Sequence, residues 1–179
     1  MPPFELVSEE EIAQGFRFTV ARATYRAADG ETFERHVIHH PGSVGVIPLH
    51  DDDTVTLVRQ YRAAMGHDLV EVPAGIRDVE GEDDATTAAR ELVEEAGLEA
   101  GQLELLARFH NSPGFSDEMV ALYLATDLRP VPHDPQGIEE QAMTIERVPL
   151  AEALADIDAG RITDAKTVIG LLTIARRRG

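Results

Sequence analysis

The sequence predicts an α+β or α/β fold in which helices pack on a mixed β-sheet. Short apolar segments bounded by turn residues recur along the chain and are typical of β-strands. Other segments place apolar residues at the three- and four-residue spacing of an amphipathic helix. The chain has 179 residues, of which 43% are hydrophobic, and is therefore long enough to bury one substantial core.

The first part of the chain predicts an antiparallel hairpin. Residues 16–26 alternate in polarity and indicate one strand, and residues 31–40 indicate the strand that returns. Asp29-Gly30 between them is a strong signal for a tight turn, and Pro41-Gly42 ends the second strand. Because a lone hairpin is only marginally stable, we expect this one to pack against another part of the protein.

We expect two domains, an N-terminal antiparallel β segment at residues 1–43 and an α/β domain at residues 44–179. Residues 129–139 show no periodicity and predict a polar loop. In the second domain, helical spacing predicts helices at 85–96, 151–159 and 165–177. The short apolar segments predict strands at 44–49, 54–59, 69–73, 103–110, 119–126 and 143–148.

The helix predicted over residues 85–96 has clear start and stop signals. Asp83 and Asp84 suit the N-terminus, where carboxylates accept hydrogen bonds from free backbone N–H groups. Gly97 suits the end, where a left-handed residue is favoured. The core-facing side of this helix is expected to comprise Ala85, Ala89, Leu92 and Ala96, and that of the last helix Val168, Leu171, Leu172 and Ala175.

Acidic side chains gather on one face of the same helix. Glu91 and Glu95 are four residues apart and project together, Glu94 lies beside them, and Arg90 can pair with Glu94. Clustered carboxylates repel one another unless a cation lies among them, and hard oxygen ligands suit Mg²⁺ or Mn²⁺. The alternative is a solvated acidic helix face with one internal salt bridge.

Residues 71–98, EVPAGIRDVEGEDDATTAARELVEEAGL, resemble the signature box of the Nudix hydrolases. Six residues separate Gly75 from Glu82, one more than is usual, which indicates an insertion in the loop before the helix. The resemblance implies the Nudix fold, an α/β/α sandwich with a mixed sheet. It also implies that the metal is held by the backbone carbonyl of Ala74 and by Glu91, Glu94 and Glu95.

Further segments resemble ADP-ribose pyrophosphatases, most closely the actinobacterial type: residues 39–49, 57–62, 71–75 and 160–167, with Pro113 sixteen residues after Gly97. This likeness implies hydrolysis of ADP-ribose to AMP and ribose 5-phosphate. One alternative is a Nudix pyrophosphatase for another nucleotide sugar or dinucleotide, such as GDP-mannose, NADH or a dinucleoside polyphosphate. A second alternative is a non-catalytic nucleotide-binding module, whose box would have lost Arg90, Glu94 or Glu95.

The resemblance also implies a general base on the loop before the last strand. Glu139 aligns best with the family's glutamate at this place. A second family carboxylate falls on Gln141, so Glu140 stays open as a substitute. The alternative is that Glu139 and Glu140 are both ordinary solvated loop residues without a role in catalysis. The residues expected to contact substrate are Arg62, Glu71, Ser112 and Glu118, with a surface ion pair as the alternative for Arg62.

Composition limits the class of protein and of partner. The net charge of −17 argues against a nucleic-acid polymer as substrate. The absence of cysteine excludes disulfides and thiolate catalysis. Neither a membrane-spanning apolar run nor the order of a signal peptide is seen, so we expect a cytoplasmic protein. The resemblance further implies a homodimer in which the N-terminal segment is exchanged.

Overall fold

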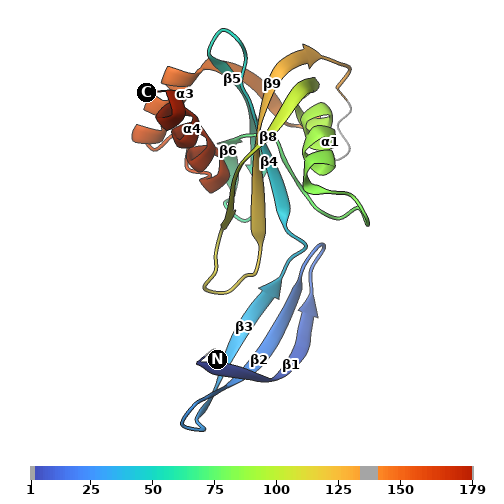
Figure 1. Ribbon diagram of the computed structural model, residues 1–179, viewed down its shortest axis with the longest axis vertical. Coiled ribbons are helices and arrows are strands. Elements are labelled where there is room, and N and C mark those ends of the chain that lie inside the picture. The colour runs from blue at the N-terminus through green and yellow to red at the C-terminus, as the bar shows by residue number, and fades with distance from the viewer. Residues whose placement is uncertain (1–2, 134–140, 179) are drawn as a thin grey trace. The chain divides into compact units, whose positions relative to one another are not determined.

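The computed structural model describes residues 3–133 and 141–178, which divide into two compact units. The N-terminal unit comprises the chain up to Gly42 together with Phe109–Met119. The main unit comprises Ser43–Arg108 and the chain from Val120 onward. Each unit has its own sheet structure (Figure 1). No helix in the described ranges is long and apolar enough to cross a membrane.

The N-terminal unit is built on an antiparallel sheet in the order β1-β2-β3. The predicted hairpin is present as β2 and β3, joined by a turn at Gly30, whose φ of 93° favours glycine. Strand β1 was not predicted, because it is exposed along its whole length and its sequence does not alternate in polarity. The bounds are β1 Phe4–Gln14, β2 Thr19–Ala27 and β3 Thr32–His39.

Residues 109–119 join the N-terminal unit through backbone pairing with β3. The N–H of Ile38 donates to the carbonyl of Phe115 at 2.7 Å, and the N–H of Asp117 donates to the carbonyl of Ile38 at 3.2 Å. This pairing extends the edge of the sheet by a short parallel bridge between Ile38 and Ser116. A loop distant in sequence is thereby fixed against the hairpin.

In the main unit, the described residues form a four-stranded sheet in the order β7-β4-β9-β8. The central strands β4 and β9 are parallel, whereas β4 and β7 are antiparallel, so the sheet is mixed as expected. Strand β7 lies within the segment that was expected to be only a loop. The bounds are β4 Ser43–Pro48, β7 Ala74–Ile76, β8 Leu98–His110 and β9 Met119–Pro130.

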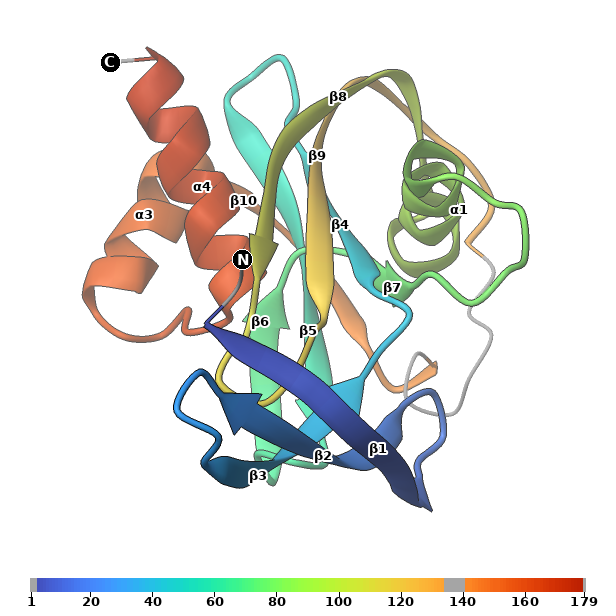
Figure 2. The same cartoon turned by 60° about the horizontal axis from the view of Figure 1, so that its bottom comes forward.

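Helices cover both faces of this sheet, and the alternation along β4 shows why. Val44 and Val46 face one side and share a core with Leu92 of α1 (Asp84–Ala96). Ile47 faces the other side, where a Cβ added at Gly170 of α4 (Ala165–Arg178) would clash with it. Both views place α1 and α4 on opposite sides of β4 and β9 (Figure 2). The expected α/β/α sandwich is therefore confirmed.

A second sheet of the main unit has the order β10-β5-β6 and is antiparallel throughout. Helix α3 packs on its strands β5 and β10. The strand predicted at 54–59 continues to Arg62, which carries this residue to the end of β5 beside β6. The bounds are β5 Thr54–Arg62, β6 His67–Glu71, β10 Thr144–Pro149 and α3 Leu150–Asp158.

Two expected inward positions are wrong. Ala89 is exposed, and Ala88 is fully buried in its place. Leu172 is exposed, whereas Ile174 is buried. The expected positions Leu92, Ala96 and Leu171 are buried as predicted. The two errors arise because packing against the sheet sets the rotation of a helix more strictly than spacing does.

Candidate active site

Helix α1 presents its carboxylates because its ends are well capped. The side chain of Asp83 accepts a hydrogen bond from the N–H of Thr86 at 2.8 Å. Gly97 is left-handed, with φ of 60°, and its N–H donates to the last carbonyls of the helix. Both predicted signals are confirmed. The rotation of the helix against the sheet places Glu91 and Glu95 on the buried side, at 8% and 4% exposure.

Arg90 is the centre of an acidic cluster on this helix. Its Nη1 donates to Glu91 Oε1 at 2.8 Å and to Glu94 Oε2 at 2.9 Å. Its Nη2 donates to Glu82 Oε2 at 3.3 Å, so the longer loop before the helix does not remove Glu82 from the cluster. Three carboxylates thus share one guanidinium, and Glu95 lies one helical turn after Glu91. The excess negative charge favours a bound cation.

Strand β7 lies directly against the two buried carboxylates. The N–H of Ala74 donates to Glu95 Oε2 at 2.8 Å. At the next residue, a Cβ added to Gly75 would overlap the carboxylate of Glu91. Glycine is required here because no side chain fits between the strand and the acid. The backbone of Ala74 and the carboxylates of Glu91 and Glu95 are therefore brought together. The group of Ala74 that meets Glu95 is its N–H, and the role of its carbonyl as a metal ligand stays a prediction.

The donor chemistry of this cluster fits an oxygen-ligated divalent cation. Among the described residues, no three His, Cys, Asp or Glu side chains converge closely enough to hold an ion. The reason is visible at Arg90, whose guanidinium neutralises Glu91 and Glu94 in the structure. A cation bound by these carboxylates would compete with Arg90 for the same oxygens.

Arg62 and Glu71 form a bidentate pair across β5 and β6. Nε of Arg62 donates to Glu71 Oε1, and Nη2 donates to Oε2, both at 2.6 Å. Burial acts to raise the pKa of Glu71, which is 1% exposed, but Arg62 and Lys166 outweigh burial and hold this pKa at about 2. The hydrogen bonds that Arg62 donates to Glu71 are the main cause that raises the pKa of Arg62, and the charge of Glu95 contributes. The pair therefore lies within electrostatic reach of the acidic cluster.

Four predicted site residues remain. Ser112 and Glu118 belong to the N-terminal unit, where Glu118 Oε2 accepts from Asn111 Nδ2 at 3.1 Å. Glu139 and Glu140 lie outside the described residues. The roles of all four in binding or catalysis stay predictions.

A cluster at the start of α4 was missed by the sequence analysis. Lys166 donates to Glu71 and, at 3.0 Å, to Asp164 Oδ1. Thr167 Oγ1 accepts from the N–H of Val72 at 2.9 Å. The signal that could have found this cluster is composition, since Lys166 is the only lysine among sixteen basic residues.

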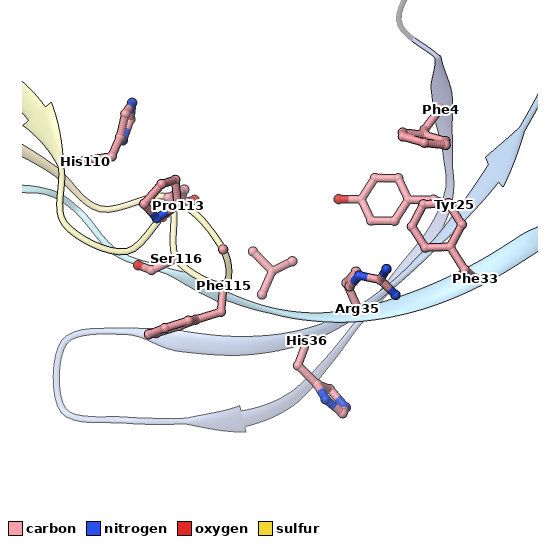
Figure 3. Close-up of a pocket in the computed structure, with 12 residues that line it drawn as sticks. Phe4, Tyr25, Phe33, Arg35, His36, His110, Pro113, Phe115 and Ser116 are labelled. Atoms are coloured by element: carbon pink, nitrogen blue, oxygen red, sulfur yellow. The ribbon is translucent and has the colours of Figure 1, made fainter.

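An aromatic cavity in the N-terminal unit was also missed. It measures about 610 Å³ and is lined by side chains of the sheet and of residues 110–117 (Figure 3). Tyr25 and Phe33 are stacked with ring centroids 5.5 Å apart, and Phe4 meets Phe33 edge-on at 5.1 Å. The Arg35 guanidinium lies 4.7 Å from the centre of the Phe33 ring. Such a surface suits a flat aromatic ligand.

Comparison with known proteins agrees with this geometry. Residues 39–168 match the NUDIX domain family. The chain is 39% identical to the ADP-ribose pyrophosphatase of Mycobacterium tuberculosis over 96% of this chain and 83% of that protein. It is 40% identical to the methanol dehydrogenase activator of Bacillus methanolicus over 80% of this chain and 77% of that protein. A solved ADP compounds hydrolase aligns at a TM-score of 0.83 over 98% of this chain and 94% of that chain, and its 22% identity shows a shared fold.

Proposed function

Because the chain belongs to the NUDIX domain family, we propose that it is a hydrolase that cleaves the pyrophosphate bond of ADP-ribose to give AMP and ribose 5-phosphate. The observation that carries the proposal is the acidic cluster around Arg90, against which strand β7 is held by Ala74 and Gly75. The relative from M. tuberculosis, matched over nearly the whole chain, supports ADP-ribose as the substrate.

Glu91, Glu94, Glu95 and the carbonyl oxygen of Ala74 are the groups that would hold Mg²⁺ or Mn²⁺. Their oxygen chemistry and the burial of Glu91 and Glu95 support this assignment. When bound, such an ion neutralises phosphate oxygens and activates a water molecule. When no metal is bound, Arg90 neutralises Glu91 and Glu94 and so reduces the repulsion between their carboxylates.

Arg62 is the proposed phosphate ligand. Its Nε and Nη2 are engaged by Glu71, and no residue of the described ranges is hydrogen-bonded to Nη1, which can therefore meet an anion. The side chain is 38% exposed and can be reached from solvent. Glu71 is almost fully buried, so it serves the substrate through Arg62. Ser112 and Glu118 are proposed to contact the sugar at the far end of the substrate.

Glu139 is proposed as the general base, with Glu140 as the substitute. Glu139→Gln should lower kcat by about 100-fold, because general-base catalysis contributes factors of this size. Glu140→Gln should have a much smaller effect. Steady-state kinetics of the two variants provide the measurement, and each variant is the other's control. If Glu140→Gln is the more damaged enzyme, the base is Glu140.

We further propose a homodimer formed through the N-terminal unit. Strand β1 is exposed along its length, and contiguous exposed apolar surface marks interaction sites. The exposed apolar side chains of this unit include Phe4, Leu6, Val7, Ile12, Phe16 and Phe18. Their exposure in the single chain is the observation that favours a partner.

The function is tested by incubating the protein with ADP-ribose and Mg²⁺, with and without EDTA, and following AMP and ribose 5-phosphate. Release of both products only with free metal supports the proposal. Cleavage of GDP-mannose, NADH or a dinucleoside polyphosphate, but not of ADP-ribose, would replace the substrate and keep the chemistry. Inactivity towards all of these substrates would refute the proposed enzymatic function. It would favour the alternative that the protein is a nucleotide-binding module.

A further inference from the structure

The only lysine of the chain is buried beside the candidate site. The side chain of Lys166 is buried, and the residue is 9% exposed. The other fifteen basic residues of the chain are all arginines. A buried ammonium group is costly unless it is paired, and this one donates to Glu71 and to Asp164. Lysine offers a compact charge with three donors, which suits a space between two carboxylates better than a planar guanidinium.

The first turn of α4 holds the chain between β6 and β7. Asp164 Oδ2 accepts from the N–H of Thr167 at 2.9 Å and from its hydroxyl at 2.6 Å. The same hydroxyl accepts from the N–H of Val72 at 2.9 Å. Thr167 thus fixes the backbone at Val72, while Lys166 fixes the side chain of the preceding residue, Glu71.

Glu71 is shared between Lys166 and Arg62. Arg62 binds both of its oxygens, and Lys166 also binds Oε2. Together with Asp164, the cluster contains two carboxylates and two cations. Without Lys166 it would contain two carboxylates and only Arg62. The added negative charge would oppose an anionic substrate, and Glu71 would lose one of the contacts that set its rotamer.

We propose that Lys166 is a positioning residue, which holds Glu71 in place so that Arg62 presents its free edge to a phosphate group of the substrate. The proposal rests on the proposed function, since the phosphate belongs to the pyrophosphate that is cleaved. Lys166 itself does not touch the substrate. Its effect passes through Glu71, whose sequence separation from Lys166 is 95 residues.

The kinetic test uses Lys166→Met, Arg62→Gln and the double variant, with ADP-ribose and Mg²⁺. Lys166→Met should raise KM about tenfold and change kcat less than about threefold, because a binding group is misplaced and not the chemistry. In the Arg62→Gln background it should add less than about twofold, because the two residues act in series. Effects that multiply in the double variant, or a KM unchanged by Lys166→Met, would overturn the proposal.

Arg59→Gln is the matched control. Arg59 lies on the same strand as Arg62 and also pairs with a glutamate, Glu146, at 2.8 Å. Breaking this exposed pair should leave KM within about twofold of the wild type. A rise in KM equal to that of Arg62→Gln would show that any ion pair of β5 has this effect, which contradicts a specific role for Lys166.

A second measurement needs neither turnover nor a Lys166 variant. Protein labelled with ¹⁵N-lysine has a single side-chain Nζ resonance, because the chain has a single lysine. This resonance should move in Arg62→Gln and stay in place in Arg59→Gln. An unchanged Nζ resonance in Arg62→Gln would refute the coupling between Lys166 and Arg62. Inactivity of the wild type on ADP-ribose would overturn the proposed function instead, while the resonance still decides on Lys166.

Discussion

At the scale of single residues, the site depends on carboxylates whose surroundings give them different tasks. Glu91 and Glu95 are buried beside β7, whereas Glu94 and Glu82 reach Arg90 from the more exposed side. Glu71 is equally buried but fully neutralised by two cations. Of the two groups of carboxylates, the one around Arg90 therefore keeps an excess of negative charge, and this is the place proposed for the cation.

Glu95→Gln should lower kcat by about 100-fold or more, because it removes one of the charges proposed to hold the metal that stabilises the transition state. The melting temperature should change little, since the glutamine oxygen still accepts the Ala74 N–H. Steady-state kinetics with Mg²⁺ and thermal melting measure the two effects.

Glu99→Gln is the control for this variant, since Glu99 is exposed and pairs only at the surface with Arg129. It should retain wild-type kcat. Loss of activity in both variants, or none in Glu95→Gln, would refute the role of Glu95.

Gly75→Ala should be damaging although it adds one methyl group. Its Cβ would overlap the Glu91 carboxylate and push the acid away from strand β7. We expect kcat to fall about tenfold or more, with a higher Mg²⁺ concentration needed for half activity. Gly114→Ala is the control, because a Cβ at Gly114 meets no atom. Equal activities of the two variants would show that the contact does not matter.

At the scale of elements, the position of the segment between β6 and β7 depends on contacts with three other elements. The segment from Glu71 to Ala74 is held by α4 through Thr167 and by α1 through Glu95. It is also held by β4, because the N–H of Val46 donates to the carbonyl of Pro73. Three elements that are far apart in sequence thus fix one short stretch of backbone.

In the N-terminal unit, His39 connects β1, β3 and residues 109–119. Its Nδ1 lies 2.6 Å from Asp117 Oδ2, and its Nε2 lies 3.2 Å from Glu9 Oε1. The hydrogen bond to Asp117 is the main cause that raises the pKa of His39, and Glu9 raises it further. The pKa of Asp117 is lowered by the hydrogen bond from His39, although burial acts to raise it.

These two shifts predict a pH window for the stability of this unit. The contribution of His39 is complete below its unfolded pKa of about 6.5 and is lost as pH rises through the higher folded value. The contribution of Asp117 is present above its unfolded pKa and is lost as pH falls through the lower folded value. The contact should therefore be strongest near pH 5 to 6, roughly between the two ranges.

Hydrogen exchange of the Ile38 and Asp117 amides, corrected for intrinsic rates, measures this effect. Their protection should decrease from about pH 5.5 to about pH 8. In His39→Gln the decrease should disappear. Protection that rises with pH in the wild type would contradict the assigned sign.

At the scale of the whole molecule, the assembly state is the main expectation. Light scattering at micromolar concentration should give twice the chain mass of 19.6 kDa. Leu6→Asp, which places a charge on exposed β1, should shift the protein towards the single-chain mass. Asp29→Asn, in the β2–β3 turn, serves as a control and should keep the wild-type mass. A wild-type protein with the single-chain mass would refute the dimer.

The sequence by itself determined the features that depend on local chemistry. The period of an α-helix places Glu91 and Glu95 on one face, and the caps at Asp83 and Gly97 set its length. The order of strands and helices was also predictable, because apolar periodicity is a local signal. Strand β1 escaped prediction because an exposed strand carries no such signal.

Tertiary structure alone decided which distant residues meet. Nothing in the local pattern pairs Glu71 with Lys166, which lies 95 residues away, or places Gly75 against Glu91. Such contacts follow from the mixed sheet, which brings α1 and α4 to the two sides of one short segment. Periodicity fixes the side on which a residue projects. Which residue it meets there depends on the packing of the whole unit. The neutralisation of Glu71 and the negative charge that remains on α1 depend on the same packing.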